Sequence, residues 1–283
     1  MADSPMRLAP DAGRRLLPWF FWAQALPALF WRWPTFAMLL SLAAVLLATV
    51  RIAPRPAAAA QLLRLGKPTE GWLRMARVLL LPLMLWPRVL VAPAQWLWPN
   101  SVVSEYPGLG LGLAITVILL VPVFEEILYR GLLLRALEPW GRLPALIVTS
   151  LVFGLGHGPV QLTGTVALGW VLGWLTLEYK SIWPAVLLHA AFNATAGLVF
   201  LAAVNVETYG PLLLSSLVLM VVAGGLVATV VNRKPLVFII QSPWAADSHA
   251  VRLSRRLMEI CRLWPIALTM ALSLLAWWLV SVG

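Results

Sequence analysis

The stretch LGLAITVILLVPVFEEILYRG, Leu111 to Gly131, decides how the rest of the chain is interpreted. Its first part is apolar enough to lie in a lipid bilayer, yet Glu125, Glu126 and Arg130 follow directly. An ionised group in hydrocarbon costs about 2.5 to 3.5 kcal/mol on insertion scales, so such groups usually face a protein interior or a wet cavity. The stretch therefore predicts a membrane-spanning helix that carries functional acids.

The composition of the whole chain agrees with this setting. The 283 residues are 61% hydrophobic and 11% charged, against about 45 to 50% and about 25% in soluble domains. We therefore predict an all-α fold, a polytopic transmembrane helical bundle of about eight or nine spans. The first two predicted spans fit either a hairpin or one long bent element. The predicted spans cover residues 16–31, 35–50, 78–98, 108–130, 143–158, 160–179, 184–204, 211–231 and 263–282.

The net charge of +10 does not indicate a nucleic-acid partner, because the basic residues are spread between the apolar runs and form no patch. Most of the 21 Lys and Arg residues fall in alternate connecting segments, which is typical of cytoplasmic loops. This pattern predicts a multi-pass protein with a cytoplasmic N-terminus, and we favour a bacterial inner membrane. Cys261 is the only cysteine, which excludes an internal disulfide.

The longest polar stretch, residues 231–262, is predicted to be a basic cytoplasmic loop. Within it, residues 250–262 fit either an amphipathic helix on the membrane surface or a solvated linker. We divide the chain into an N-terminal membrane region (1–106), a catalytic core (107–204) and a C-terminal region (205–283).

The first polar cluster inside a predicted span is the glutamate pair. Glu126 and Arg130 are four positions apart and share a helix face, whereas Glu125 points about a quarter-turn away. A structural ion pair is the simpler explanation for Glu126 and Arg130, and it leaves Glu125 free for chemistry. Arg88, in the middle of another predicted span, is interpreted as a side chain that snorkels from a kinked helix.

Two further clusters contain histidine. His157 lies in the glycine-rich sequence FGLGHG, and His189 precedes Asn193 by one helical turn. Either histidine alone fits a hydrogen bond between helices equally well. Together with an intramembrane glutamate pair, however, two imidazoles and an amide donor are the groups that hydrolysis requires. His157 would lie deeper than the other groups in an upright helix, so we expect the glycine-rich segment to tilt or break.

These three clusters resemble the three motifs of the CPBP family, which comprises the type II CAAX prenyl endopeptidases and the related bacteriocin-processing and self-immunity proteins. The resemblance covers about residues 107–204. The motifs appear in the family's order, in successive hydrophobic segments: Glu125-Glu126-x-x-x-Arg130, Phe153-x-x-x-His157 and His189-x-x-x-Asn193.

The resemblance implies a glutamate-dependent intramembrane protease that acts on a membrane-tethered, lipidated or hydrophobic protein or peptide. It implies that Glu125 activates water with help from His157. It further implies that His189 and Asn193 stabilise the oxyanion or hold the water, while Glu126 and Arg130 orient the site.

A zinc ion held by Glu125, His157 and His189 is a possible cofactor, but the chain lacks an HExxH motif, so we expect no metal. Two other functions stay open at this point. One is a non-catalytic scaffold or immunity factor of the same fold, and the other is a transporter with a proton relay.

Overall fold

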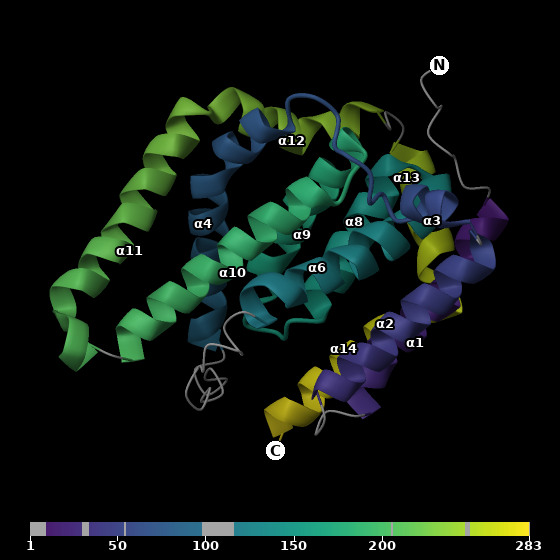
Figure 1. The fold of residues 1–283 in the computed structure, drawn as a ribbon, viewed down its shortest axis with the longest axis horizontal. Coiled ribbons are helices and arrows are strands. Elements are labelled where there is room, and N and C mark those ends of the chain that lie inside the picture. Colours follow the sequence, from purple (N-terminus) through teal and green to yellow (C-terminus); the bar gives the residue numbers. More distant parts are fainter. Residues whose placement is uncertain are drawn as a thin grey trace.

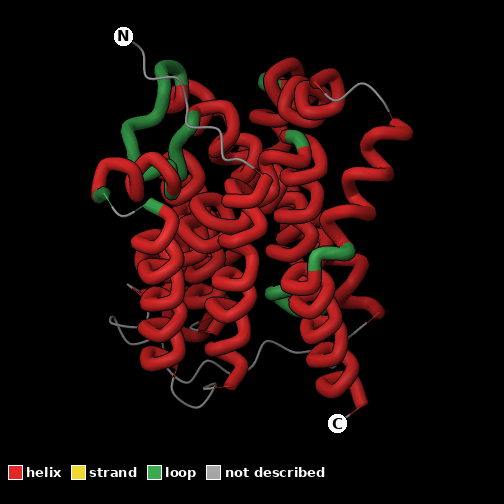
Figure 2. Tube along the Cα trace, turned by 90° about the vertical axis from the view of Figure 1, so that its right-hand side faces the viewer, coloured by secondary structure: helices red, strands yellow, loops and turns green. Residues whose placement is uncertain are grey.

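The computed structural model describes residues 10–29, 34–53, 55–97, 116–204, 206–246 and 250–282. In these residues the chain forms helices joined by short loops, without a strand, as the composition predicts (Figure 2). The first part contains α1 (Pro10–Leu29), α2 (Pro34–Ile52), α3 (Pro56–Leu62) and α4 (Trp72–Leu97). The middle part contains η1 (Thr116–Leu120), α6 (Val121–Glu126), η2 (Ile127–Leu134), α7 (Arg135–Leu137), η3 (Glu138–Trp140), α8 (Arg142–Leu155), α9 (Leu162–Tyr179) and α10 (Trp183–Val204). The last part contains α11 (Val206–Val231), α12 (Arg233–Ala246), α13 (Ala250–Cys261) and α14 (Trp264–Val282).

The first two helices form a packed pair. α1 and α2 lie against each other, and Ser41 Oγ on α2 donates a hydrogen bond to Ala23 O on α1 at 2.8 Å. Of the two arrangements that the sequence allows, the structure therefore has two separate helices. Residues 30–33, which join them, lie outside the described part of the chain.

The centre of the bundle is formed by α8, α9 and α10 (Figure 1). On one side, α4 packs against both α9 and α10, and α11 covers α4. On the other side lie α1, α2 and α14. The predicted core region is thus flanked by helices that come before and after it in the sequence.

Two glycines on α9 allow its neighbours to approach closely. A Cβ atom at Gly164 would stand 2.2 Å from the Pro87 O atom of α4, and one at Gly169 would stand 3.2 Å from the Phe153 Cδ1 atom of α8. Small residues at helix contacts are typical of helices that pack without a strong hydrophobic driving force.

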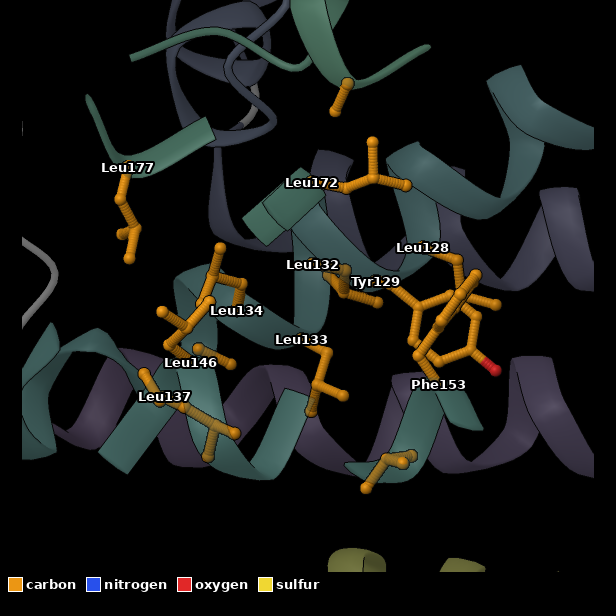
Figure 3. Close-up of a cluster of buried hydrophobic side chains, with 14 of the residues drawn as sticks. Leu128, Tyr129, Leu132, Leu133, Leu134, Leu137, Leu146, Phe153, Leu172 and Leu177 are labelled. Atoms are coloured by element: carbon orange, nitrogen blue, oxygen red, sulfur yellow. The ribbon is translucent and has the colours of Figure 1, made fainter. Parts of the chain in front are cut away.

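The apolar core lies beside the helix that carries the glutamate pair. Leu128, Leu132 and Leu133 of η2 are almost completely buried, together with Leu146 of α8 and Leu172 of α9. Figure 3 shows this leucine cluster continuing to Tyr129 and Phe153, whose rings pack edge to face with centroids 5.0 Å apart. The core therefore fixes the rotation of η2, and with it the direction in which the preceding acids point.

The turn between α9 and α10 is bound to the segment that precedes α4. Ile182 N donates to Arg64 O and Thr69 N donates to Tyr179 O, both at 3.1 Å. Ser181 Oγ donates to Gly66 O, in the same segment before α4, at 2.7 Å. These bonds fix the N-terminal end of α10, the helix that carries His189.

The predicted cytoplasmic loop at residues 231–262 is more ordered than expected. The helix α13 confirms that this segment is helical, with Ile260 buried and Arg255 exposed, and its position on the membrane surface stays a prediction. The helix α12 was not predicted, because its polar residues lower its hydrophobicity. It is anchored to α9, since Trp174 Nε1 donates to Ser242 Oγ at 2.9 Å.

None of the described helices is, by itself, both long and apolar enough to cross a bilayer. Three bent pairs meet the length and composition criteria together: Leu39–Ile52 with Pro56–Leu62, Val218–Val231 with Arg233–Ala245, and Leu253–Cys261 with Trp264–Leu275. The number of membrane spans remains a prediction.

Candidate active site

The glutamate pair lies in one continuous helix whose hydrogen-bond register changes at both ends of α6. A π-helical segment, η1, leads into the α-helical turn α6, which ends at Glu126, and a second π-helical segment, η2, follows. The helix therefore continues beyond residue 130, where the sequence pattern predicted its end. Single π-helical turns inside α-helices are rare and occur frequently at functional sites.

Glu126 is the centre of a buried network. Its Oε1 atom accepts a hydrogen bond from Arg130 Nη1 at 2.9 Å and another from His189 Nδ1 at 2.8 Å. The side chains of Glu126 and Arg130 are completely buried, and that of His189 is 3% exposed. The predicted ion pair is confirmed, but the bond from Glu126 to His189 was missed because it joins helices far apart in the sequence.

The Arg130 guanidinium is held by groups from two other helices. Arg130 Nη2 donates to Gly169 O on α9 at 3.3 Å, and the guanidinium carbon lies 4.4 Å from the centroid of the Phe153 ring on α8. A buried ion pair needs such additional partners to offset the loss of hydration. Arg130 thereby fixes the Glu126 carboxylate against the centre of the bundle.

Glu125 faces both histidines. Its Oε2 atom lies 3.6 Å from His189 Nε2 and 3.9 Å from His157 Nε2. This oxygen is buried and has no hydrogen-bond partner, although the Glu125 side chain as a whole is 21% exposed. Separations slightly longer than a hydrogen bond allow a water molecule to interact with all three groups. The structure thus brings together Glu125, His157 and His189, three of the four residues for which the resemblance implies a catalytic role.

In both imidazoles the Nδ1 atom is bound to a fixed acceptor, and the Nε2 atom faces Glu125. His157 Nδ1 lies 2.7 Å from Phe153 O, and a carbonyl can only accept, so His157 Nδ1 carries a proton. His189 Nδ1 donates to Glu126 in the same way. Each histidine consequently directs its Nε2 atom to Glu125. A fixed tautomer of this kind is how an active site orients a histidine.

His157 reaches the site because its helix ends early. The helix α8 stops at Leu155, and Gly158 adopts a positive φ of 89°, which reverses the chain toward α9. This break confirms one of the two outcomes expected for the glycine-rich segment. A side chain other than glycine rarely adopts such a conformation, so the glycine at position 158 has a specific backbone role.

Asn193 lies one turn further along α10 than His189 and has a different partner. Its Nδ2 atom donates to Val117 O in η1 at 3.0 Å. Among the described residues, no hydrogen bond joins Asn193 to Glu125 or to either histidine of the site. In the structure, Asn193 therefore lies beside the site and contacts the backbone of the helix that carries the two glutamates.

Arg88 does not snorkel as the sequence suggested. Its guanidinium donates to Phe192 O on α10 at 3.2 Å and to the Met84 carbonyl, and it stacks on the Phe192 ring at 4.4 Å from the centroid. A charged residue in the middle of an apolar run was the available signal, since such residues usually face the protein interior.

Among the described residues, no group of three or more His, Cys, Asp and Glu side chains has an arrangement that could hold a metal ion. Glu125, His157 and His189 are close together, and the absence of a metal from the site stays a prediction. The catalytic steps proposed below involve only side chains and water.

The comparison with known protein families supports the resemblance. Residues 107–195 match the family model described as type II CAAX prenyl endopeptidase, Rce1-like. No curated protein and no solved structure matches the chain. The match covers less than half of the chain, but it includes Glu125, His157, His189 and Asn193, as well as the Glu126–Arg130 pair. It confirms the family resemblance for the segment that forms the site: residues 107–195 match the Rce1-like type II CAAX prenyl endopeptidases.

Proposed function

We propose that this protein is an intramembrane endopeptidase that hydrolyses a peptide bond in a membrane-tethered, lipidated or hydrophobic substrate. The observation that carries the proposal is the position of Glu125 Oε2, a buried oxygen without a hydrogen-bond partner that faces the Nε2 atoms of two histidines. A general base must lie within reach of the water that it deprotonates, directly or in a slightly open apo geometry. The family match supports a protease.

In the proposed mechanism, Glu125 accepts a proton from water while the water oxygen attacks the scissile carbonyl carbon. The neutral His157 Nε2 accepts the other hydrogen bond of the water and so orients its lone pair. The Glu125 carboxyl then transfers its proton to the leaving nitrogen when the C–N bond breaks. Both proton transfers use the same carboxyl group, so the site returns to its starting state.

His189 has a different environment, because its Nδ1 proton is donated to the Glu126 carboxylate. A carboxylate at this position orients the ring and stabilises positive charge on it, as the aspartate does in serine proteases. We assign to His189 the stabilisation of the oxyanion of the tetrahedral intermediate, through an Nε2 proton in its charged form. Removal of one such donor typically costs about 10²- to 10³-fold in rate.

A direct test is to compare the cleavage products of the membrane proteome with wild type and with Glu125→Gln at equal expression. Glu178→Gln is the matched control, because Glu178 forms an ion pair with Arg142 at 3.2 Å in which both side chains are about half exposed. Products present with wild type and with the control, but missing with Glu125→Gln, are the expected result. Identical products in all three samples would remove the protease proposal and leave a non-catalytic scaffold or immunity factor.

The same products also test the cofactor. If water is activated by Glu125 alone, cleavage by purified protein is unchanged after prolonged incubation with a chelator, and metal analysis finds no stoichiometric zinc. Loss of cleavage that is restored by added zinc would overturn the metal-free mechanism and make Glu125, His157 and His189 the candidate zinc ligands.

The location of the protein is part of the proposal. A site that opens within the bilayer is accessible to a substrate anchored there, and the distribution of Lys and Arg supports a cytoplasmic N-terminus. Labelling of Cys261, the only cysteine and an exposed one, with a membrane-impermeant thiol reagent tests this orientation. Labelling in inverted vesicles but not in intact cells is expected.

A further inference from the structure

Arg88 is a charged residue in the middle of an apolar helix, outside the region that the family model matches. It belongs to α4, and the charged residues nearest to it in the sequence are Arg77 and Glu105. A charged side chain is costly at the depth of a bilayer, so it usually faces a partner or a water-filled cavity and has a function. The question is which negative group Arg88 binds.

The partners of the Arg88 guanidinium in the described part of the chain are all uncharged. It donates to Phe192 O at 3.2 Å and to the Met84 carbonyl, and its carbon lies 4.4 Å from the centroid of the Phe192 ring. A guanidinium has five N–H groups, and these two bonds use only two of them. None of the ion pairs among the described residues includes Arg88. Within the described residues, Arg88 is therefore a cation with spare donors and no counter-ion.

The arginines that are buried in the described bundle differ from Arg88 in this respect. The Arg130 guanidinium binds the Glu126 carboxylate at 2.9 Å. That of Arg135 binds the Glu138 carboxylate at 2.6 Å. A carboxylate offsets the loss of hydration that burial imposes on a cation. Arg88 is half-buried, so a carboxylate from another molecule can occupy the place that a glutamate takes beside the other two.

Arg88 lies close to the candidate active site, because α4 packs against both helices that extend from the histidines. The helix α10 carries His189 one turn before Phe192, the residue that Arg88 binds. On another side, the Pro87 O atom of α4 lies against the first turn of α9, which begins shortly after His157. An extended peptide advances about 3.3 Å per residue, so a group a few residues from the scissile bond can reach Arg88.

We propose that Arg88 binds a carboxylate of the substrate and so selects peptides that carry one a few residues from the scissile bond. A carboxylate fits this guanidinium because its two oxygens can accept two parallel N–H bonds. The carboxylate belongs either to the C-terminus of the substrate or to an aspartate or glutamate side chain, since both make the same contact. The inference rests on the proposed function, which makes the neighbouring site a peptide-binding one.

The test measures binding, with Glu125→Gln as the background so that a bound peptide is not hydrolysed. The probe is a dansylated peptide of leucine and alanine that ends in a free carboxylate, compared with the same peptide ending in a carboxamide, both in uncharged detergent micelles. The carboxylate peptide is expected to bind about 10- to 100-fold more tightly, the range that a hydrogen bond to a charged group supplies. Equal affinities would overturn the proposal without the need for any change at Arg88.

A change at Arg88 then separates carboxylate binding from a role in the fold. Arg88→Gln removes the charge but keeps a donor for Phe192 O, and the preference for the carboxylate peptide is expected to disappear. Arg142→Gln is the matched control and should leave the preference unchanged, because Arg142 is half exposed and already binds Glu178 at 3.2 Å. If Arg88 only supports the fold, Arg88→Gln weakens the binding of both peptides by the same factor, and that result would contradict the proposal.

A third probe identifies the source of the carboxylate. It ends in a carboxamide and has one glutamate in place of an alanine. Tight binding of this probe shows that a side-chain carboxylate is accepted, whereas tight binding of the first probe alone assigns the C-terminus. With Glu125 intact, kcat/KM is expected to follow the same order as the affinities. Absence of cleavage of every probe, with the binding preference retained, would count against the peptidase and leave the carboxylate site in place.

Discussion

Glu126→Gln is the most informative single change for the stability of the site. The substitution keeps the shape of the side chain but removes its charge, so Arg130 becomes a buried cation without a counter-ion. Glu126 and Arg130 are both completely buried, and their atoms are 2.9 Å apart. Removal of one partner from a buried pair costs about 3 to 5 kcal/mol, because the remaining charge has lost its hydration. We expect a loss of that size in the free energy of unfolding.

The measurement is equilibrium unfolding in mixed micelles with an increasing fraction of denaturing detergent. Circular dichroism follows the helices, and the fluorescence of the 16 tryptophans follows the tertiary packing. Glu178→Gln is the matched control, since the same substitution then affects a half-exposed pair, where about 0 to 1 kcal/mol is expected. A third variant, Glu126→Gln with Arg130→Met, removes both charges and should recover a large part of the loss.

The outcome that refutes this reasoning is equal stability of the two glutamine variants. It would mean that water reaches Arg130 or that the guanidinium finds another anion. Failure of the Arg130→Met change to recover stability would show that the loss comes from the bond between Glu126 and His189, and not from the unpaired cation.

Further predictions concern the contacts around α4 and α9. Gly164→Ala should lower the unfolding midpoint, because its Cβ would stand 2.2 Å from the backbone oxygen of Pro87 and the helices must separate, at about 1 to 3 kcal/mol. Gly197 is also in a helix, but a Cβ atom added there would meet no atom of another element within 4 Å. Gly197→Ala should therefore be neutral or stabilise by up to about 1 kcal/mol in thermal unfolding. A larger loss of stability for Gly197→Ala than for Gly164→Ala would contradict the packing. Arg88→Met keeps an unbranched apolar stem but loses the bond to Phe192, so a destabilisation of about 1.5 to 3 kcal/mol is expected in detergent unfolding. Arg88→Lys should recover only part of it, since an ammonium group cannot donate in the fork geometry of a guanidinium; wild-type stability of both variants would show that the contact contributes nothing.

Local spacing predicted the parts of the site that lie within one helix. Glu126 and Arg130 are four residues apart, and helical geometry alone brings their side chains together. The helix class also follows from composition, because apolar runs of this length have few other solutions in a bilayer. The glycines around His157 correctly marked the end of α8, since a backbone with positive φ has few alternatives to glycine.

Contacts between helices could not be predicted in this way. The bond from His189 to Glu126 depends on how α10 is rotated against α6, which is decided by packing and not by the pattern of either helix. The partner of Asn193 was hidden for another reason, because hydropathy does not distinguish a π-helical from an α-helical register. The helix α12 was missed because Ser242 and its polar neighbours are typical of a linker. The bond from Trp174 to Ser242 that anchors the helix joins segments far apart in the sequence.

The π-helical turn η1 also determines how the chain tolerates changes in length. A π-helical turn contains one more residue than the α-helical turn that it replaces, so it acts as a stored insertion. Removal of one residue, such as the exposed Leu119, can be absorbed by a return to α-helical register, and both glutamates then keep their orientation. The same deletion in α9 has no such reserve and would rotate every following side chain of that helix by about 100°. The segment before Glu125 and Glu126 is therefore a place where this fold can shorten while the two carboxylates keep their orientation.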